Sequence, residues 1–229
     1  MDQKIPFTSY DFWAYLSAGF MLLFALDQVV GMHMLMRETW TIVQGVMAVS
    51  VAYAVGHLVA SASSFLYERL LVGKVLGYPR NILFGNVTAR RGLQKLLPGY
   101  FLLLPAETQK TALEKGGKVG VDKPGEALFW SAHVYGRGTP AVAARLDNFL
   151  NIYGFCRNVA LVGLIDAALL YWSYWQPKGP PEHLLWARIS LVISIGMTLR
   201  YLKFYRHFAL EVFTSWAFAK DKEPEVKKP

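Results

Sequence analysis

Residues 40–66, WTIVQGVMAVSVAYAVGHLVASASSFL, decide the fold: these 27 residues carry no formal charge, and His57 is the only basic side chain among them. About 20 predominantly apolar residues suffice to cross the ~30 Å hydrocarbon core of a bilayer, because an α-helix rises 1.5 Å per residue. A helix buried in the core of a soluble protein seldom needs so long a run without charge. The stretch therefore predicts a transmembrane helix.

Three further stretches have the same character on either side of this one. They are residues 12–34, 149–175 and 184–204. The start of the chain is not typical of a cleaved signal peptide, because its first apolar stretch is longer than the 7–15 residues of such a segment. We therefore expect an all-α membrane protein with four transmembrane helices.

The connections between these stretches differ in charge. Residues 67–148 contain twelve Lys and Arg and residues 205–229 contain five, whereas the turns at residues 35–39 and 176–183 contain one each. Lys and Arg accumulate in the cytoplasmic loops of membrane proteins. Both termini and the long insert are therefore expected in the cytoplasm.

The resulting organisation has four segments. Residues 1–66 hold transmembrane helices 1 and 2, residues 67–148 form a small, mainly helical cytoplasmic insert, residues 149–204 hold transmembrane helices 3 and 4, and residues 205–229 form a cytoplasmic helix extension with a disordered basic tail. Three helices should extend into the cytoplasm, because the second continues to Gly73 and no proline interrupts residues 141–176 or 182–219. A short helix is expected at residues 105–115.

The composition of the chain excludes several classes of protein and of binding site. The chain is 54% apolar and 17% charged, against about 45–50% and about 25% in soluble domains. Its single cysteine, Cys156, excludes an internal disulfide framework and a cysteine-based zinc site. We attribute the net charge of +8 mainly to membrane topology and to contact with phospholipid headgroups, and nucleic-acid binding is the less favoured interpretation.

Motifs for catalysis are missing from the sequence. It contains no P-loop, no dinucleotide-binding glycine motif, no H-E-x-x-H pair and no nucleophile elbow. We therefore expect no catalytic residue, no cofactor and no metal site. A non-enzymatic role is favoured, although the sequence leaves the question of enzymatic activity open.

Ionisable side chains inside the spans are the candidate functional residues, since each costs a few kcal/mol in a bilayer unless it is paired or hydrated. Helical rise and the expected orientation place Asp27, Asp166 and Arg188 in the outer half of the membrane, within about 13 Å of its outer edge. We expect them to form an intramembrane charge cluster. Such a cluster could fix the helix register, line an ion or proton pathway, or act in sensing or gating.

Other polar residues complete the candidate set. Arg157 lies nearer the cytoplasmic edge and cannot pair with Asp166, because nine residues place the two on opposite helix faces. The remaining candidates are the intramembrane His57 and a cytoplasmic basic face of Arg200, Lys203 and His207 where the last helix leaves the membrane.

Three short segments resemble those of small multi-spanning bacterial inner-membrane proteins of unknown function. They are IPFTSYDF at residues 5–12, YGFCRN at residues 153–158 and YLKFYR at residues 201–206. Some similar proteins are components of antiphage defence systems such as Kiwa. The resemblance implies a bacterial inner-membrane location and a role in defence, but no functional residue carries over from it.

The leading functional hypothesis is a non-enzymatic integral membrane protein that oligomerises with itself and senses or signals at the membrane. Its extended helices carry aromatic stripes that need a partner, either the insert or another subunit, and its cytoplasmic layer could engage a cytoplasmic protein. A small ion channel or transporter is the alternative. A membrane lipid enzyme comes third, with only the scattered residues Glu68, Asp147 and His133 to serve it.

Overall fold

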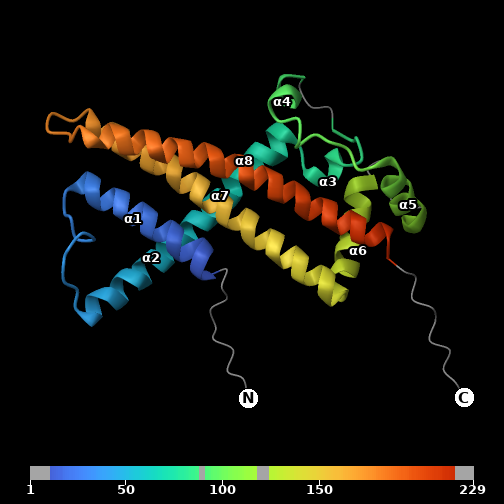
Figure 1. Ribbon diagram of the computed structural model, residues 1–229, viewed down its shortest axis with the longest axis horizontal. Coiled ribbons are helices and arrows are strands. Elements are labelled where there is room, and N and C mark those ends of the chain that lie inside the picture. The colour runs from blue at the N-terminus through green and yellow to red at the C-terminus, as the bar shows by residue number, and fades with distance from the viewer. Residues whose placement is uncertain (1–10, 88–90, 118–123, 220–229) are drawn as a thin grey trace, which may run out of the picture. The chain divides into compact units, whose positions relative to one another are not determined.

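The computed structural model describes residues 11–87, 91–117 and 124–219 (Figure 1). All regular elements within these ranges are helices, which confirms the predicted all-α class. The chain divides into two compact units: Met1–Val75 with Asn151–Phe204 form unit 1, and Leu76–Leu150 with Tyr205–Pro229 form unit 2. The predicted disordered tail at residues 220–229 lies outside the described residues.

Three helical runs are long and apolar enough to cross a membrane: Ile42–Ile82, Pro140–Tyr174 and Glu182–Ala217. The first run comprises α2 (Ile42–Ser63), its π-helical continuation η2 (Ser64–Leu76) and α3 (Pro79–Ile82). The other two are α7 (Pro140–Tyr174) and α8 (Glu182–Ala217), of 35 and 36 residues. α7 and α8 are therefore each roughly 50 Å long and exceed the ~30 Å bilayer core, as expected because no proline interrupts them.

The first apolar helix is shorter than predicted. It consists of η1 (Asp11–Leu16) and α1 (Ser17–Val30), and its apolar part, Ala14–Val30, falls short of the three long runs. The helix ends because Gly31 adopts a left-handed conformation (φ 74°), the usual glycine stop. The predicted continuation to residue 34 is therefore wrong, and a fourth span stays a prediction.

The turn after α1 leads into a well-marked helix start. Thr41 accepts a hydrogen bond from the backbone of Gln44 (3.3 Å), and the Gln44 side chain accepts one from the backbone of Thr41 (3.0 Å). This reciprocal capping box satisfies two of the backbone N–H groups that a helix N-terminus leaves unpaired. It fixes the beginning of α2.

Glycines bring the helices of unit 1 close together. The backbones of α1 and η1 approach α2 at Gly19 and Gly56, where an added Cβ would overlap the carbonyls of Ala52 and Tyr15 (Figure 1). Small residues at such crossings are typical of membrane helices. On the other side of the unit, α7 packs against α8, and Ser194 donates a hydrogen bond to the Ala160 carbonyl (2.7 Å).

Burial differs sharply among the long helices. In the most apolar stretch of α7, 56% of the residues are buried. In the corresponding stretches of the α2 run and of α8, 17% are buried. Exposed Ile42 and Val192 illustrate the apolar surface of the two outer helices. Such surface suits contact with lipid acyl chains, whereas α7 is the interior helix.

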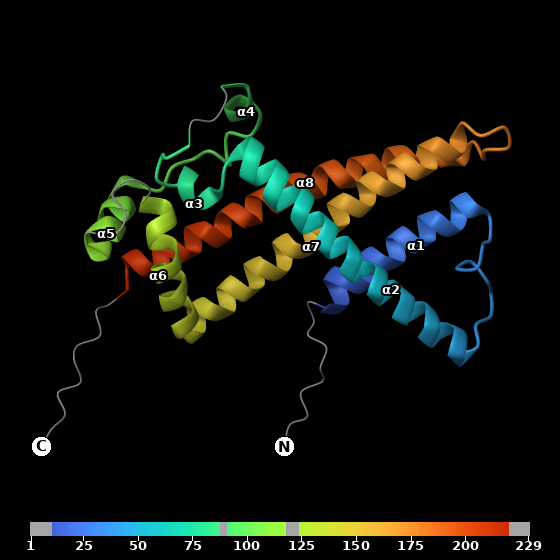
Figure 2. The ribbon, with the colours of Figure 1, turned by 180° about the vertical axis from the view of Figure 1, so that it is seen from behind.

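Unit 2 contains several short helices (Figure 2), and aromatic side chains pack together in its core. It contains α3, α4 (Arg91–Leu96), α5 (Ala106–Gly116), α6 (Pro124–Gly138) and the ends of α7 and α8. Phe213 packs edge-to-face against Phe84 and Phe129, at centroid distances of 4.9 and 5.9 Å. The helix expected at residues 105–115 is confirmed as α5, displaced by one residue.

Candidate functional site

Asp166 lies on α7 with only 5% of its surface exposed. It lines a cavity of about 730 Å³ within unit 1, between α1, α7, α8 and the turn that joins α7 to α8. That volume falls in the range of about 300–1,000 Å³ typical of small-molecule sites. Most of the wall is apolar, with Phe24, Leu170 and Ile193 among its residues.

Two polar atoms of the cavity wall are unsatisfied. Asp166 Oδ1 and Gln28 Nε2 are buried, and neither has a hydrogen-bond partner among the described residues. Leaving a buried polar atom unpaired costs about 1–3 kcal/mol, and more for a charged group. The cavity wall thus contains one acceptor and one donor that the described residues leave unpaired.

A hydrogen bond closes the end of the same cavity. His183 Nδ1, at the start of α8, lies 3.0 Å from Ser173 Oγ on the last turn of α7, and both side chains are buried. Gly179 in the connecting turn passes so close to the Ser173 and Tyr174 carbonyls that a side chain would collide with them. The α7–α8 turn is therefore tightly closed over the cavity.

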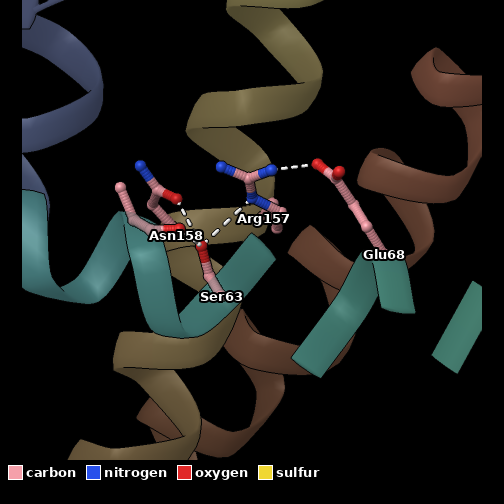
Figure 3. Close-up of polar contacts among 5 residues, drawn as sticks. Ser63, Glu68, Arg157 and Asn158 are labelled. Carbon is pink, nitrogen blue, oxygen red and sulfur yellow. Dashed lines mark hydrogen bonds and ion pairs between the residues drawn. The ribbon is translucent and has the colours of Figure 1, made fainter. Parts of the chain in front are cut away.

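A second polar cluster joins three helical elements through Arg157 (Figure 3). Arg157 on α7 forms an ion pair with Glu68 on η2 and donates from Nε to Ser63 Oγ (3.1 Å). Ser63 donates to Asn158 Oδ1 (2.6 Å), and Asn158 Nδ2 donates to the Ala14 carbonyl (3.1 Å). These contacts connect η1, the α2–η2 helix and α7, and they explain how Arg157 is accommodated in an apolar helix.

Asp27 and Arg188 form no hydrogen bond or ion pair with Asp166 within the described residues. The Asp27 carboxylate accepts hydrogen bonds from the backbone of Met34 (2.9 Å) and Leu35 (3.0 Å), so it caps its own turn, and it lines a different cavity of about 380 Å³. Arg188 is exposed on α8 and forms no ion pair within the described part of the chain. The structure therefore brings none of the three residues of the predicted charge cluster into an ion pair with another.

The other candidate residues have mainly aromatic surroundings. His57 stacks on Tyr15 (centroids 4.1 Å apart) and meets Tyr53 edge-on (4.6 Å). In the predicted basic face, Arg200 and Lys203 both lie over the Phe204 ring, at 5.1 and 5.9 Å. His207 lies beside Phe149 at 6.1 Å.

The three residues considered for a lipid enzyme also have interaction partners. Glu68 is paired with Arg157, Asp147 is paired with Arg137, and His133 stacks on Phe129 at 5.9 Å. The described residues contain no group of three or more His, Cys, Asp or Glu side chains that could hold a metal ion.

Comparison with known proteins found no matching family model, no matching curated protein and no matching solved structure.

The sequence identified Asp166 but missed the residues around it. Gln28, Ser173 and His183 come from three separate places in the chain, and hydropathy does not show that they meet. One signal was present: Gln28 is a second polar residue inside an apolar stretch, directly after Asp27. Polar residues in such stretches tend to face a cavity or a neighbouring helix.

Proposed function

We propose that the chain is a non-enzymatic, multi-pass protein of the bacterial inner membrane that oligomerises and senses or signals at the membrane. In this proposal the apolar helix at Ala14–Val30 is a fourth span. Both termini and the basic segment between α2 and α7 lie in the cytoplasm. The Lys and Arg distribution and the three long apolar helices support this arrangement.

The observation that carries the proposal is the Asp166 cavity. Asp166 and Gln28 line a space of about 730 Å³ inside unit 1, and a carboxylate oxygen of Asp166 and the amide nitrogen of Gln28 have no hydrogen-bond partner among the described residues. A proton or a cation would satisfy the Asp166 oxygen, and a small polar molecule with a donor and an acceptor would satisfy both atoms. Such binding would thereby change how α1, α7 and α8 pack, which is what a membrane sensor requires.

Tryptophan fluorescence tests the sensing role directly, because Trp172 and Trp186 line the cavity. Emission of the full-length chain in nanodiscs is recorded against pH and against added Na⁺ or K⁺. We expect a change in emission that Asp166→Asn removes and Trp186→Phe diminishes. Asp27→Asn is the matched control, since Asp27 lines another cavity and its loss should leave the response intact.

Other titratable and charged groups line the same cavity. They are His33, Lys178, Glu182 and His183. Comparing Asp166→Asn with the unaltered chain separates the contribution of Asp166 from theirs. A response that survives in Asp166→Asn would contradict the assignment of Asp166 as the sensing group.

A small channel or transporter is the second candidate, favoured by the same unpaired carboxylate, because intramembrane carboxylates commonly mark proton and cation pathways. Liposomes that contain the chain and a pH-sensitive dye distinguish the two functions. Proton or cation flux that depends on Asp166 would favour transport. An Asp166-dependent fluorescence change without flux would favour sensing, and absence of both would contradict both proposals.

A further inference from the structure

Another cavity in unit 1, an open one of about 440 Å³, lies beside the Arg157 cluster and has a different chemical character. Its wall is polar and basic, and it includes two arginines, one histidine, one tyrosine and two serines. They are Tyr15, His57, Ser61, Ser64, Arg69 and Arg157. Most of them lie on the α2–η2 helix, while Tyr15 comes from η1 and Arg157 from α7.

Both arginines keep donors that the protein does not use. Arg69 is exposed and makes no hydrogen bond or ion pair within the described ranges. Arg157 engages Nε and one terminal nitrogen, and its other terminal nitrogen has no partner there (Figure 3). The Ser64 hydroxyl is likewise without a hydrogen bond in the described part of the chain.

We propose that this cavity binds a phosphate group. A guanidinium presents a planar fork of N–H donors that matches the oxygens of a phosphate, and charge-assisted bonds of this kind are the strong ones. Glu68 compensates Arg157 from outside the cavity wall, whereas Arg69 has no acidic partner among the described residues, so the cavity keeps a positive charge. This site is separate from the Asp166 cavity and does not depend on the sensing role proposed for it.

In the proposed topology the cavity lies toward the cytoplasmic ends of the α2 run and α7, where the long Arg69 side chain can reach phospholipid headgroups. Arg69 is 27 residues beyond the start of α2 at Ile42, and Arg157 is 17 residues before the end of α7 at Tyr174. At 1.5 Å per residue these separations are roughly 40 and 25 Å, which bracket the ~30 Å hydrocarbon core. A lipid phosphate and a soluble phosphate could both reach the site, and phosphate is the chemistry that they share.

Binding measurements on the purified full-length chain in a non-ionic detergent test the proposal. Dioctanoyl phosphatidic acid and inorganic phosphate are titrated separately, with dioctanoylglycerol as the probe that lacks phosphate. We expect phosphatidic acid to bind and to raise Tm, while dioctanoylglycerol does neither. Binding of phosphatidic acid alone would assign the site to a lipid headgroup, and binding of inorganic phosphate as well would show that the phosphate group suffices.

Two variants should act in opposite directions. Arg69→Gln should weaken binding about tenfold, the effect expected for one charge-assisted hydrogen bond. Glu68→Gln should tighten it, because Arg157 then loses its compensating charge. Arg188→Gln removes the same charge as Arg69→Gln from an exposed site outside the cavity, and it should leave binding unchanged.

Three results would overturn the proposal. They are failure of both phosphate probes to bind, equal weakening by Arg69→Gln and Arg188→Gln, and no tightening in Glu68→Gln. The last result is decisive even if the Arg69 variant does not fold, because the amide oxygen that Glu68→Gln introduces can still accept a hydrogen bond from Arg157.

Discussion

Arg157 is the charge of the predicted spans that forms an ion pair, with Glu68, and it also donates a hydrogen bond to Ser63. The Arg157 side chain is 11% exposed and that of Glu68 is 28% exposed. Removing one member of a buried ion pair destabilises a protein by about 3–5 kcal/mol, because the other charge is left unpaired. Partial exposure of Glu68 should reduce that figure here.

A double-mutant cycle on Tm and chemical unfolding measures this coupling. Arg157→Ala should destabilise unit 1 by about 2–4 kcal/mol, and adding Glu68→Gln should restore part of the loss. Arg188→Ala is the control and should change stability by less than about 0.5 kcal/mol, as exposed substitutions do. Strictly additive effects of the Arg157 and Glu68 substitutions would show that the ion pair contributes nothing.

The sequence could not predict which residues pair with the candidate charges. Arg157 and Asp166 stood out because each is a charge inside an apolar stretch. The partner of Arg157 lies 89 residues earlier in the chain, and nothing in a single sequence relates the two positions. Arg188 stood out by the same criterion, yet it is exposed and unpaired within the described residues, because an arginine near a helix end can extend to the water.

His133 on α6 should make unit 2 sensitive to acid. Burial, and next the nearby charge of Arg137, lower the pKa of His133 from its ordinary value of 6.5. The folded state therefore binds a proton less readily than the unfolded state. The stabilisation is fully present above pH 6.5 and is lost as the pH falls from 6.5 through the lowered pKa.

Thermal unfolding at several pH values tests this expectation. The Tm of the unaltered chain should fall as the pH drops below 6.5, and His133→Leu should make that fall less steep. An unchanged slope in His133→Leu would contradict the assignment.

Among the helices, the crossing of α1 and η1 with α2 depends on backbone contact. Gly56→Ala should destabilise this crossing by about 1–3 kcal/mol, because the new methyl group overlaps the Tyr15 backbone. Gly45→Ala on the same helix meets nothing within 4 Å and should be stabilising by about 0.4–1 kcal/mol, as at other unstrained helical glycines. Urea unfolding of both variants measures the difference, and equal effects would contradict close packing at Gly56.

The sequence predicted the helix boundaries correctly where a proline sets them. The beginnings of α7 and α8 lie beside Pro140 and Pro181, and no proline interrupts either helix. The sequence did not predict the end of α1, because residues 31–34 are apolar and hydropathy alone extends the helix through them. Gly31 and the Asp27 side chain stop it there through local backbone hydrogen bonds, which a hydropathy window does not detect.

For the whole molecule, the expected topology is testable by cysteine accessibility. In a Cys156→Ala background, Gly117→Cys should be protected from a membrane-impermeant thiol reagent in intact cells. Lys178→Cys should be labelled, because the α7–α8 turn is expected on the outer side. Labelling of Gly117→Cys from outside would contradict the cytoplasmic assignment.

Self-association is the second prediction at this scale. Trp130 and Val134, one helical turn apart on α6, are 61% and 69% exposed and lie outside the three long apolar runs. Exposed apolar neighbours of this kind often mark protein interfaces. We expect a detergent-corrected mass that is a multiple of 25.8 kDa, and a smaller particle for Trp130→Ser combined with Val134→Ser. A single-chain mass in several mild detergents would contradict oligomerisation.

The closed turn between α7 and α8 has a consequence for biosynthesis. α7 carries both Arg157 and Asp166, and each charge opposes entry of an isolated helix into lipid. The turn is short, and Gly179 and the His183–Ser173 hydrogen bond hold its ends together. In the proposed topology the two helices would therefore enter the bilayer as one hairpin, with little polar chain between them to translocate. A stop codon placed before α8 should reduce insertion of α7, which is long and apolar enough to cross a membrane but then carries both charges without its neighbouring helix.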